Sequence, residues 1–156
     1  MTRVFRPESG SSKRNRMLRQ IATALRYAVD GSPTQEETWD LLAFVVLCLH
    51  EIESTVEQAA EAWERRDYWV KADRYRHTWS WVHTSARELE NALAKSDVEA
   101  AMGAALDIAQ AMDGAKPYKA RNKRPWQGAF DTWRANGHSA KRDQFAPKSQ
   151  VDDNED

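Results

Sequence analysis

The sequence predicts an all-α protein, an antiparallel four-helix bundle with a short fifth C-terminal helix and flexible charged ends. Apolar residues recur at alternating spacings of three and four in four successive segments, as on one face of a helix. Short stretches with capping or turn residues separate these segments, which favours antiparallel neighbours. No segment alternates apolar and polar residues as a strand would. The 156 residues form about one domain, with a flexible basic N-terminus over 1–10, the bundle over 11–136 and a flexible tail over 137–156 that ends acidic.

Capping residues predict where the first two helices begin. Ser11 or Ser12 is expected to cap the first helix. This helix ends near Asp30 and carries an apolar face of Leu18, Ile21, Leu25 and Ala28. Thr34 and Glu37 form a capping box for the second helix, expected over 34–66. Apolar residues surround its first half, so we expect this helix to be central and covered on several sides.

A shift in the apolar face marks the start of the third helix. The step from Trp63 to Tyr68 is five residues, which rotates the face by roughly 140°. We therefore expect a tight turn over 64–67, with Asp67 as the next N-cap. Whether 34–94 forms two helices or one bent helix stays open. The apolar stripe of this third segment is Tyr68, Ala72, Tyr75, Trp79, Val82, Ala86, Leu89 and Leu93.

Two shorter helices complete the predicted fold. Ser96 and Glu99 predict a capping box for a fourth helix that ends at Gly114. The residues expected to face inward on this helix are Val98, Met102, Ala105, Ile108 and Met112. A fifth helix is expected over 125–135. Three of its aromatic residues share one face: Trp126, Phe130 and Trp133.

Nothing in the sequence predicts a membrane span or a secretory signal. The longest nearly unbroken apolar run, over 41–49, has nine residues, about half of the roughly 20 that cross a bilayer. The N-terminal residues lack an apolar h-region. Cys48 is the single cysteine and lies in an apolar turn, so we expect a buried thiol rather than a nucleophile. A cytoplasmic protein with no membrane partner is therefore expected.

The net charge of −1 is the sum of segments with opposite signs. Residues 1–26 carry +6, residues 27–115 carry −10, residues 116–148 carry +7 and residues 149–156 carry −4. This pattern predicts an acidic body with basic ends. Because the body would repel a polyanion, we expect it to face protein neighbours or solvent.

Basic and aromatic side chains are dense over 116–126, where five basic and two aromatic residues occupy eleven positions. Lys and Arg neutralise phosphates while aromatic rings stack on unpaired bases, a combination that binds single-stranded nucleic acid. RNA or single-stranded DNA is therefore the predicted partner, together with other protein subunits of a complex. The alternative is that the basic ends pair with the acidic body. The predicted nucleic-acid-binding residues are Lys13, Arg14, Arg16, Arg19, Arg74, Trp81, Lys116, Tyr118, Lys119, Arg121, Lys123, Arg124 and Trp126.

Trp81 is expected to lie off the apolar stripe and to be at least partly exposed, near Arg74. An exposed Trp beside Arg can stack on a base, and it can equally anchor a protein partner. A second hypothesis is therefore a protein–protein adaptor that uses Trp81 and the fifth helix. A purely structural alternative is that the fifth helix packs over Trp81 and covers it.

Only one residue pair is a candidate for catalysis. Arg76 and His83 lie seven residues apart, a spacing similar to the Arg-x(4–6)-His motif of HEPN ribonucleases. That resemblance implies that Arg76 would bind the scissile phosphate and that His83 would act in acid–base chemistry. A metal-independent ribonuclease is the third hypothesis, and the leading expectation is that the protein is not an enzyme.

No metal, cofactor or small-molecule substrate is expected. Glu36, Glu37 and Asp40 resemble half of the acidic motif of MazG-type nucleotide pyrophosphohydrolases, but the preceding helix has no acid over 13–26 to complete a Mg²⁺ site. Roles in the cap and first turn of the second helix are expected for these carboxylates. The other metal-ligand pairs are isolated in the sequence: His50 with Glu53, and Asp73 with His77.

The predicted bundle, its size and its basic patches resemble the small α-helical subunits of CRISPR effector ribonucleoprotein complexes. The resemblance is at the level of the fold and no sequence motif carries it, so it transfers no functional residue. It implies a non-enzymatic subunit that presents basic side chains to guide and target nucleic acid in antiviral defence. The leading prediction is therefore a helical subunit that binds nucleic acid backbone through its basic ends.

Overall fold

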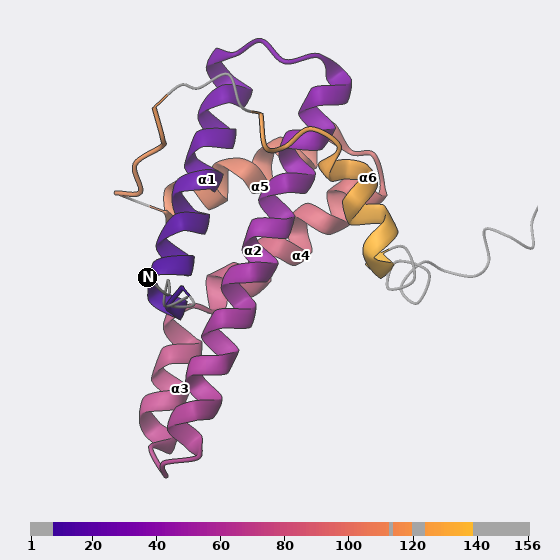
Figure 1. Ribbon diagram of the computed structural model, residues 1–156. Coiled ribbons are helices and arrows are strands. Elements are labelled where there is room, and N and C mark those ends of the chain that lie inside the picture. The colour runs from indigo at the N-terminus through magenta and orange to yellow at the C-terminus, as the bar shows by residue number, and fades with distance from the viewer. Residues whose placement is uncertain (1–7, 113, 120–123, 139–156) are drawn as a thin grey trace, which may run out of the picture.

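The computed structural model describes residues 8–112, 114–119 and 124–138, and every regular element in these ranges is helical (Figure 1). The all-α class is thus confirmed. The antiparallel four-helix order stays a prediction, and the flexible ends expected over 1–10 and 137–156 lie mostly outside the described residues. In chain order the elements are α1 (Gly10–Asp30), α2 (Gln35–Glu64), α3 (Trp69–Thr78), α4 (Ser80–Ala94), α5 (Val98–Ala111), α6 (Ala129–Trp133) and a π-helical turn (Arg134–His138).

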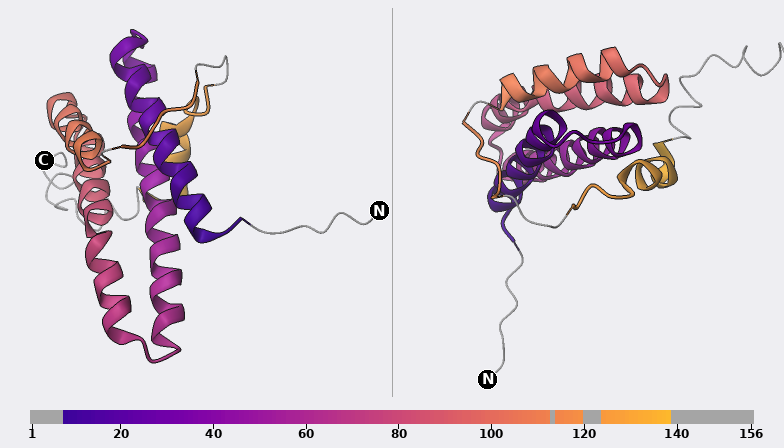
Figure 2. Two further views of the ribbon diagram at one scale, coloured as in Figure 1. Left: turned by 90° about the vertical axis from the view of Figure 1, so that its left-hand side faces the viewer. Right: turned by 90° about the horizontal axis from the view of Figure 1, so that it is seen from above.

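α2 is the central helix, as its apolar sequence predicts. α1, α3, α4 and α6 all pack on it, while α5 packs mainly on α4. Figure 2 shows α1 and α2 between α6 on one side and α4 with α5 on the other. Leu42, Leu49 and Ile52 of α2 are buried in the shared core. The expectation of a helix covered on several sides is confirmed.

Hydroxyl side chains cap the first two helices. Thr34 accepts a hydrogen bond from the Glu37 backbone N–H at 3.1 Å, as predicted for α2. α1 begins earlier than predicted, because Ser9 caps it by accepting from the Ser12 N–H at 3.1 Å. The assignment of the cap to Ser11 or Ser12 was wrong. Ser9, Ser11 and Ser12 all carry a hydroxyl group that can cap a helix. The helix begins after Ser9, which is the most N-terminal of the three.

The third expected helix is divided at Trp79 into α3 and α4. Trp79 has φ −98° and ψ 7°, outside the α-helical range. Thr78 Oγ1 donates to the Arg74 carbonyl at 2.9 Å, and Ser80 Oγ donates to the His77 carbonyl at 2.7 Å. Such bonds to the preceding turn compete with the backbone ladder and bend a helix. The segment that the sequence left undecided therefore forms three helices.

Two residues predicted as caps lie in turns instead. The turn over 64–67 is confirmed, but Asp67 has φ +64° and does not cap α3. Ser96 has φ +52°, and Asp97 caps α5 by accepting from the Ala100 N–H at 3.0 Å. Residues in the left-handed region change the chain direction between helices, so each one serves the turn and cannot also cap the next helix.

α6 is shorter than the expected fifth helix and is held by α2. It begins at Ala129 rather than Pro125, because Gly128 precedes it with φ +77°. The Asp40 carboxylate on α2 accepts from the backbone N–H groups of Gly128 at 3.2 Å and Phe130 at 3.0 Å. A side chain from another helix thus satisfies the N-terminal donors of α6.

The core follows the predicted apolar stripes with three exceptions. Val98 and Met102 were expected to face inward on the fourth helix, but they are 45% and 41% exposed, because α5 packs mainly on α4 and buries three of its alanines and Ile108 instead. Tyr68 was expected to face inward, but it is 57% exposed because it lies at the end of the α2–α3 hairpin, beyond the core. Cys48 is buried, and desolvation raises its pKa to about 12, so a thiolate nucleophile at neutral pH is excluded. Among the helices of the described ranges, none is long and apolar enough to cross a membrane.

Candidate nucleic-acid interface

Residues 116–119 lie against α1, so two basic segments that are far apart in the sequence meet there. Arg19 Nε donates to the Lys116 carbonyl at 3.1 Å, and the guanidinium carbon lies 4.0 Å from the centre of the Tyr118 ring. Within the described ranges, no ion pair engages Arg19, Lys116 or Lys119. We name Arg19, Lys116, Tyr118 and Lys119 the α1 basic face. Two predicted binding residues lie outside the described residues, Arg121 and Lys123.

Local geometry explains why these residues meet. Gly114, after the end of α5, has φ +88°, a conformation that glycine adopts without steric cost. The Tyr118 N–H then donates to Thr23 Oγ1 at 2.8 Å, and the same hydroxyl donates to the Arg19 carbonyl at 2.8 Å. Thr23 lies one helical turn after Arg19, which places Tyr118 against that guanidinium.

Two predicted binding residues of α1, Lys13 and Arg16, pair with carboxylates of the same chain. Lys13 Nζ lies 2.6 Å from Glu51, and Arg16 lies 2.8 Å from Glu8. The hydrogen bonds that Arg16 donates to the Glu8 carboxylate raise the pKa of Arg16. The alternative that the basic ends pair with the acidic body describes Lys13, because its partner Glu51 lies in that body. Arg16 pairs instead within the N-terminal segment.

Arg14 is part of the packing between α1, α2 and α3. Its Nη1 donates to Thr55 Oγ1 at 3.3 Å. Its guanidinium carbon lies 5.3 Å from the Tyr75 ring centre and 5.7 Å from that of Trp79. Cation–π contacts of this kind orient Arg14 inward rather than toward a ligand.

Arg124 and Trp126 attach the C-terminal segment to the α1–α2 end of the fold. Arg124 pairs with Glu37 at 2.8 Å and lies 5.2 Å above the Tyr27 ring, whose hydroxyl donates to Glu37 at 3.0 Å. Trp126 is 3% exposed and packs 4.9 Å from the Tyr27 ring. Its ring is therefore inaccessible to a base, although it was a predicted stacking residue.

The acidic residues at the start of α2 have structural roles. Glu36 and Glu37 lie in its first turn, as expected. Glu37 also holds Tyr27 and Arg124, and Asp40 caps α6 instead of α2. Glu37 and Asp40 therefore hold neighbouring segments on α2, while Glu36 lies in the first turn of that helix.

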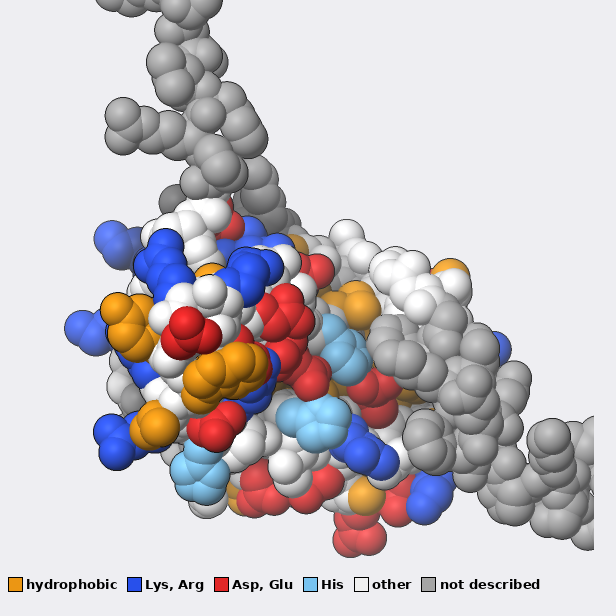
Figure 3. All heavy atoms as spheres, turned by 90° about the horizontal axis from the view of Figure 1, so that it is seen from below, with side chains coloured by type: hydrophobic (Ala, Val, Ile, Leu, Met, Phe, Trp, Pro, Cys, Tyr) orange, Lys and Arg blue, Asp and Glu red, His pale blue; other side chains and the backbone are white. Residues whose placement is uncertain are grey.

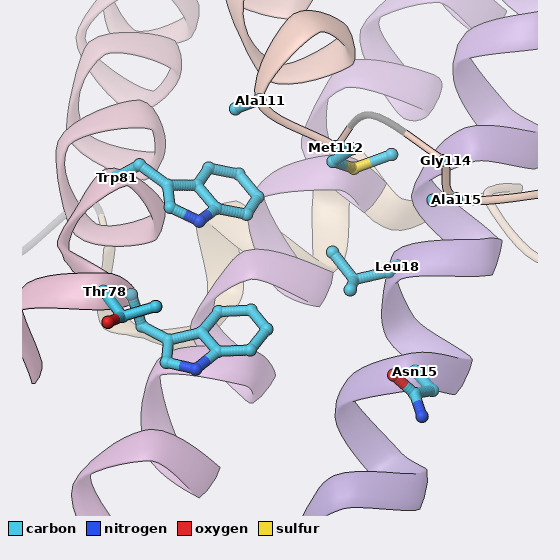
Figure 4. A pocket seen from close by; sticks show the side chains of 9 residues that line it. Asn15, Leu18, Thr78, Trp81, Ala111, Met112, Gly114 and Ala115 are labelled. Atoms are coloured by element: carbon cyan, nitrogen blue, oxygen red, sulfur yellow. The ribbon is translucent and has the colours of Figure 1, made fainter. Parts of the chain in front are cut away.

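Trp81 lines a groove between α1, the α3–α4 junction and the end of α5. Its ring is half-buried, as predicted, and stacks on Trp79 with centres 6.4 Å apart and planes at 27°. Figure 4 shows Trp81 pointing from α4 toward Met112 and Leu18. The groove has a volume of about 350 Å³, and none of its described lining residues comes from α6. The alternative in which the fifth helix covers Trp81 therefore does not describe this groove.

Arg76 and His83, the catalytic candidates, each contact glutamates of α2. Arg76 donates to Glu57 at 2.8 Å and also to Glu64, and these hydrogen bonds raise its pKa. His83 Nδ1 lies 2.6 Å from Glu53. The α3–α4 junction also separates the two residues, which do not share one continuous helix. A substrate phosphate would have to displace carboxylates from both side chains.

His50 joins the same acidic surface between α2 and α4. Its Nε2 lies 2.6 Å from Glu90, and its Nδ1 lies 3.7 Å from Glu53. In the part of the chain that the structure describes, no group of three or more His, Cys, Asp or Glu residues could hold a metal ion. We interpret the contacts of His50 with Glu90 and of His83 with Glu53 as links between α2 and α4.

The end of the α2–α3 hairpin is a basic and aromatic surface that sequence reasoning missed. We name residues 65–74 the hairpin tip. Five of the seven basic residues found over 27–115 lie between 65 and 76. Figure 3 looks onto this end, where hydrophobic side chains lie among Lys and Arg, with Asp or Glu side chains next to them. The net charge of −10 over residues 27–115 hides this cluster of basic residues. The net charge of successive ten-residue segments would have revealed it. The exposed side chains of the hairpin tip are Arg65, Arg66, Tyr68, Trp69, Val70, Lys71 and Arg74, together with the two acids Asp67 and Asp73, so the basic residues outnumber the acidic ones by four to two.

Comparisons of the chain with protein-family models, with curated proteins and with solved structures found no match.

Proposed function

We propose that the protein is a non-enzymatic helical subunit that binds the backbone of RNA or single-stranded DNA through the α1 basic face. The meeting of Arg19 with Lys116 and Tyr118, 97 residues along the chain, carries this proposal. The scaffold that we propose is an antiparallel bundle within a larger ribonucleoprotein, similar to the small subunits of CRISPR effector complexes. The chain would act in the cytoplasm.

The chemistry of the α1 basic face fits a single-stranded polyanion. Lys116 and Lys119 are exposed ammonium groups that can contact successive phosphates. Arg19 bonds the Lys116 carbonyl through Nε alone, which leaves its Nη groups to contact an oxyanion. The Arg19–Tyr118 stack adds a flat surface that suits an unpaired base.

The pairing of other basic residues narrows the interface. Lys13, Arg16 and Arg124 already contact carboxylates, so a nucleic acid would gain little from them unless those pairs opened. The acidic helices repel phosphates, which restricts binding to the side of α1 where residues 116–119 lie. The acidic body is then left for protein neighbours or solvent.

The test measures binding of a fluorescent single-stranded RNA by anisotropy between about 50 and 200 mM salt. For the variant that carries both Lys116→Ala and Lys119→Ala, we expect weaker binding. The slope of log affinity against log salt should fall by about 1.4, since each single-strand phosphate contact contributes about 0.7. Lys95→Ala, an exposed lysine beyond α4, is the matched control and should leave the slope unchanged. Affinity that does not depend on salt, or a double variant that binds like the wild type, would overturn the proposal.

The groove beside Trp81 favours a second candidate function, a protein–protein adaptor. Two stacked tryptophans at a hollow surface are typical anchors for a partner side chain. Purification of the full chain from its native host separates the two functions. A defined set of proteins that persists at moderate salt, disappears with Trp81→Ala and comes without RNA would favour the adaptor.

A further inference from the structure

The hairpin tip exposes three adjacent apolar side chains. Tyr68 and Trp69 are each 57% exposed, and Val70 is 65% exposed. Contiguous apolar surface of this kind, bordered by charged residues, is typical of an interaction site rather than of a solvent-facing helix end. Trp and Tyr are also the residues that contribute most at protein interfaces.

The cations of the hairpin tip are not all used within the molecule. Lys71 lies 4.6 Å above the Trp63 ring. In contrast, no ion pair formed among the described residues includes Arg65, Arg66 or Arg74. The tip therefore offers three arginines to an acidic partner around its apolar centre.

A second exposed apolar surface runs along α5. Val98, Met102 and Leu106 are 45%, 41% and 60% exposed, and their spacing of four places them on one face of the helix. α5 contains no Lys or Arg, and its charged residues are Glu99 and Asp107. We name the three apolar residues the α5 stripe. Its charge is opposite to that of the hairpin tip.

These two surfaces cannot cover each other within one molecule. In Figures 1 and 2 the hairpin tip lies at one end of the fold and α5 lies toward the other. We propose that the hairpin tip of one copy docks on the α5 stripe of a second copy. This single contact covers both apolar surfaces and brings three arginines toward the carboxylates of α5. A nucleic acid at the tip would leave the α5 stripe uncovered and would meet acidic charge there.

The contact joins two different surfaces, so it is heterologous and leaves a tip and a stripe available at each end of the pair. The apolar centre is small, which places the interface among weak associations that bury less than about 1,200 Å². Association should therefore depend on protein concentration and weaken with salt. It requires no nucleic acid and is independent of the proposed function.

The test is sedimentation velocity of the nuclease-treated full chain over about a hundredfold range of concentration. Trp69→Asp changes the tip and Leu106→Asp changes the α5 stripe, and both sites are exposed, so the fold should survive. We expect each variant alone to stay monomeric, with self-association weakened about tenfold or more. Val29→Asp is the matched control, because Val29 is 77% exposed and belongs to neither surface. Circular dichroism verifies the helical content of all three variants.

Mixing the two variants gives the decisive result. A Trp69→Asp molecule keeps its stripe and a Leu106→Asp molecule keeps its tip, so the mixture should form a one-to-one dimer. Three outcomes would overturn the proposal. The wild type stays monomeric throughout, or the mixture stays monomeric, or Leu106→Asp alone associates like the wild type, which would mean that tips bind tips.

Discussion

Replacement of Asp40 by Ala should release α6 from the rest of the fold. The Asp40 carboxylate is the acceptor for the N–H groups of Gly128 and Phe130, at 3.2 Å and 3.0 Å. Alanine removes both acceptors. The Gly128 N–H is exposed and can bond water, but the Phe130 N–H is partly buried and loses its partner.

The size of the effect follows from these two bonds. Loss of an N-cap costs about 1 kcal/mol, and a buried donor left without a partner costs about 1 kcal/mol more. A destabilisation of about 1 to 2 kcal/mol lowers the melting temperature of a chain of this size by about 2 to 8 °C. Asp40→Asn keeps one side-chain acceptor and should lose less than Asp40→Ala.

Thermal unfolding and hydrogen exchange of the Phe130 amide measure this prediction. Glu36→Ala is the control, because Glu36 is exposed in the first turn of the same helix and accepts no bond from α6 in the described structure. Its melting temperature should change by about 1 °C or less. If Asp40→Ala keeps both the melting temperature and the slow exchange of Phe130, the carboxylate does not cap α6 and the argument fails.

Three further predictions concern the core and the dependence of stability on pH. Leu49→Ala, at a fully buried position of α2, should cost about 2 to 5 kcal/mol in urea unfolding, and a cost below about 1 kcal/mol would contradict the central place of α2. Burial raises the pKa of Cys48 from 9.0 to about 12, so the unfolded chain loses this proton first and stability should fall between about pH 9 and 12, less so in Cys48→Ala. The Arg76 hydrogen bond lowers the pKa of Glu57 from 4.5, so its stabilisation is present above that pH and is lost as the pH falls further. Glu57→Gln should therefore flatten the acid side of the urea midpoint profile, and an unchanged profile would show that the pair contributes nothing.

The sequence predicted the central helix because local signals agree there. Thr34 offers a cap, and the apolar residues around the first half of α2 require cover on several sides. The division between α3 and α4 was missed for a physical reason. The stripe continues through Trp79, whereas the bend comes from Thr78 and Ser80 bonding back to carbonyls, and apolar spacing carries no information on such bonds.

The candidate site was less predictable than the fold. The basic residues near the ends were visible in the sequence, but which of them pair internally depends on contacts between distant segments. Arg19 meets Lys116 across 97 residues, and Arg124 meets Glu37 across 87. Asp40 looked like a residue of the first helical turn, yet it binds the backbone of α6. A sequence shows the charges of a chain, and only the fold assigns their partners.

Carboxylates of the acidic body therefore determine which basic side chains are left to bind a ligand. Its carboxylates bind Lys13 on α1 and Arg76 on α3, and the cost of breaking such pairs reduces what these cations can contribute to a ligand. Among the described residues, two separated groups of cations make no ion pair: Arg19, Lys116 and Lys119 at the α1 basic face, and Arg65, Arg66 and Arg74 at the hairpin tip. They differ in what surrounds them: the first has an arginine stacked on a tyrosine beside two lysines, and the second has arginines around exposed apolar side chains. Phosphates favour the first arrangement, while an apolar and acidic protein surface favours the second.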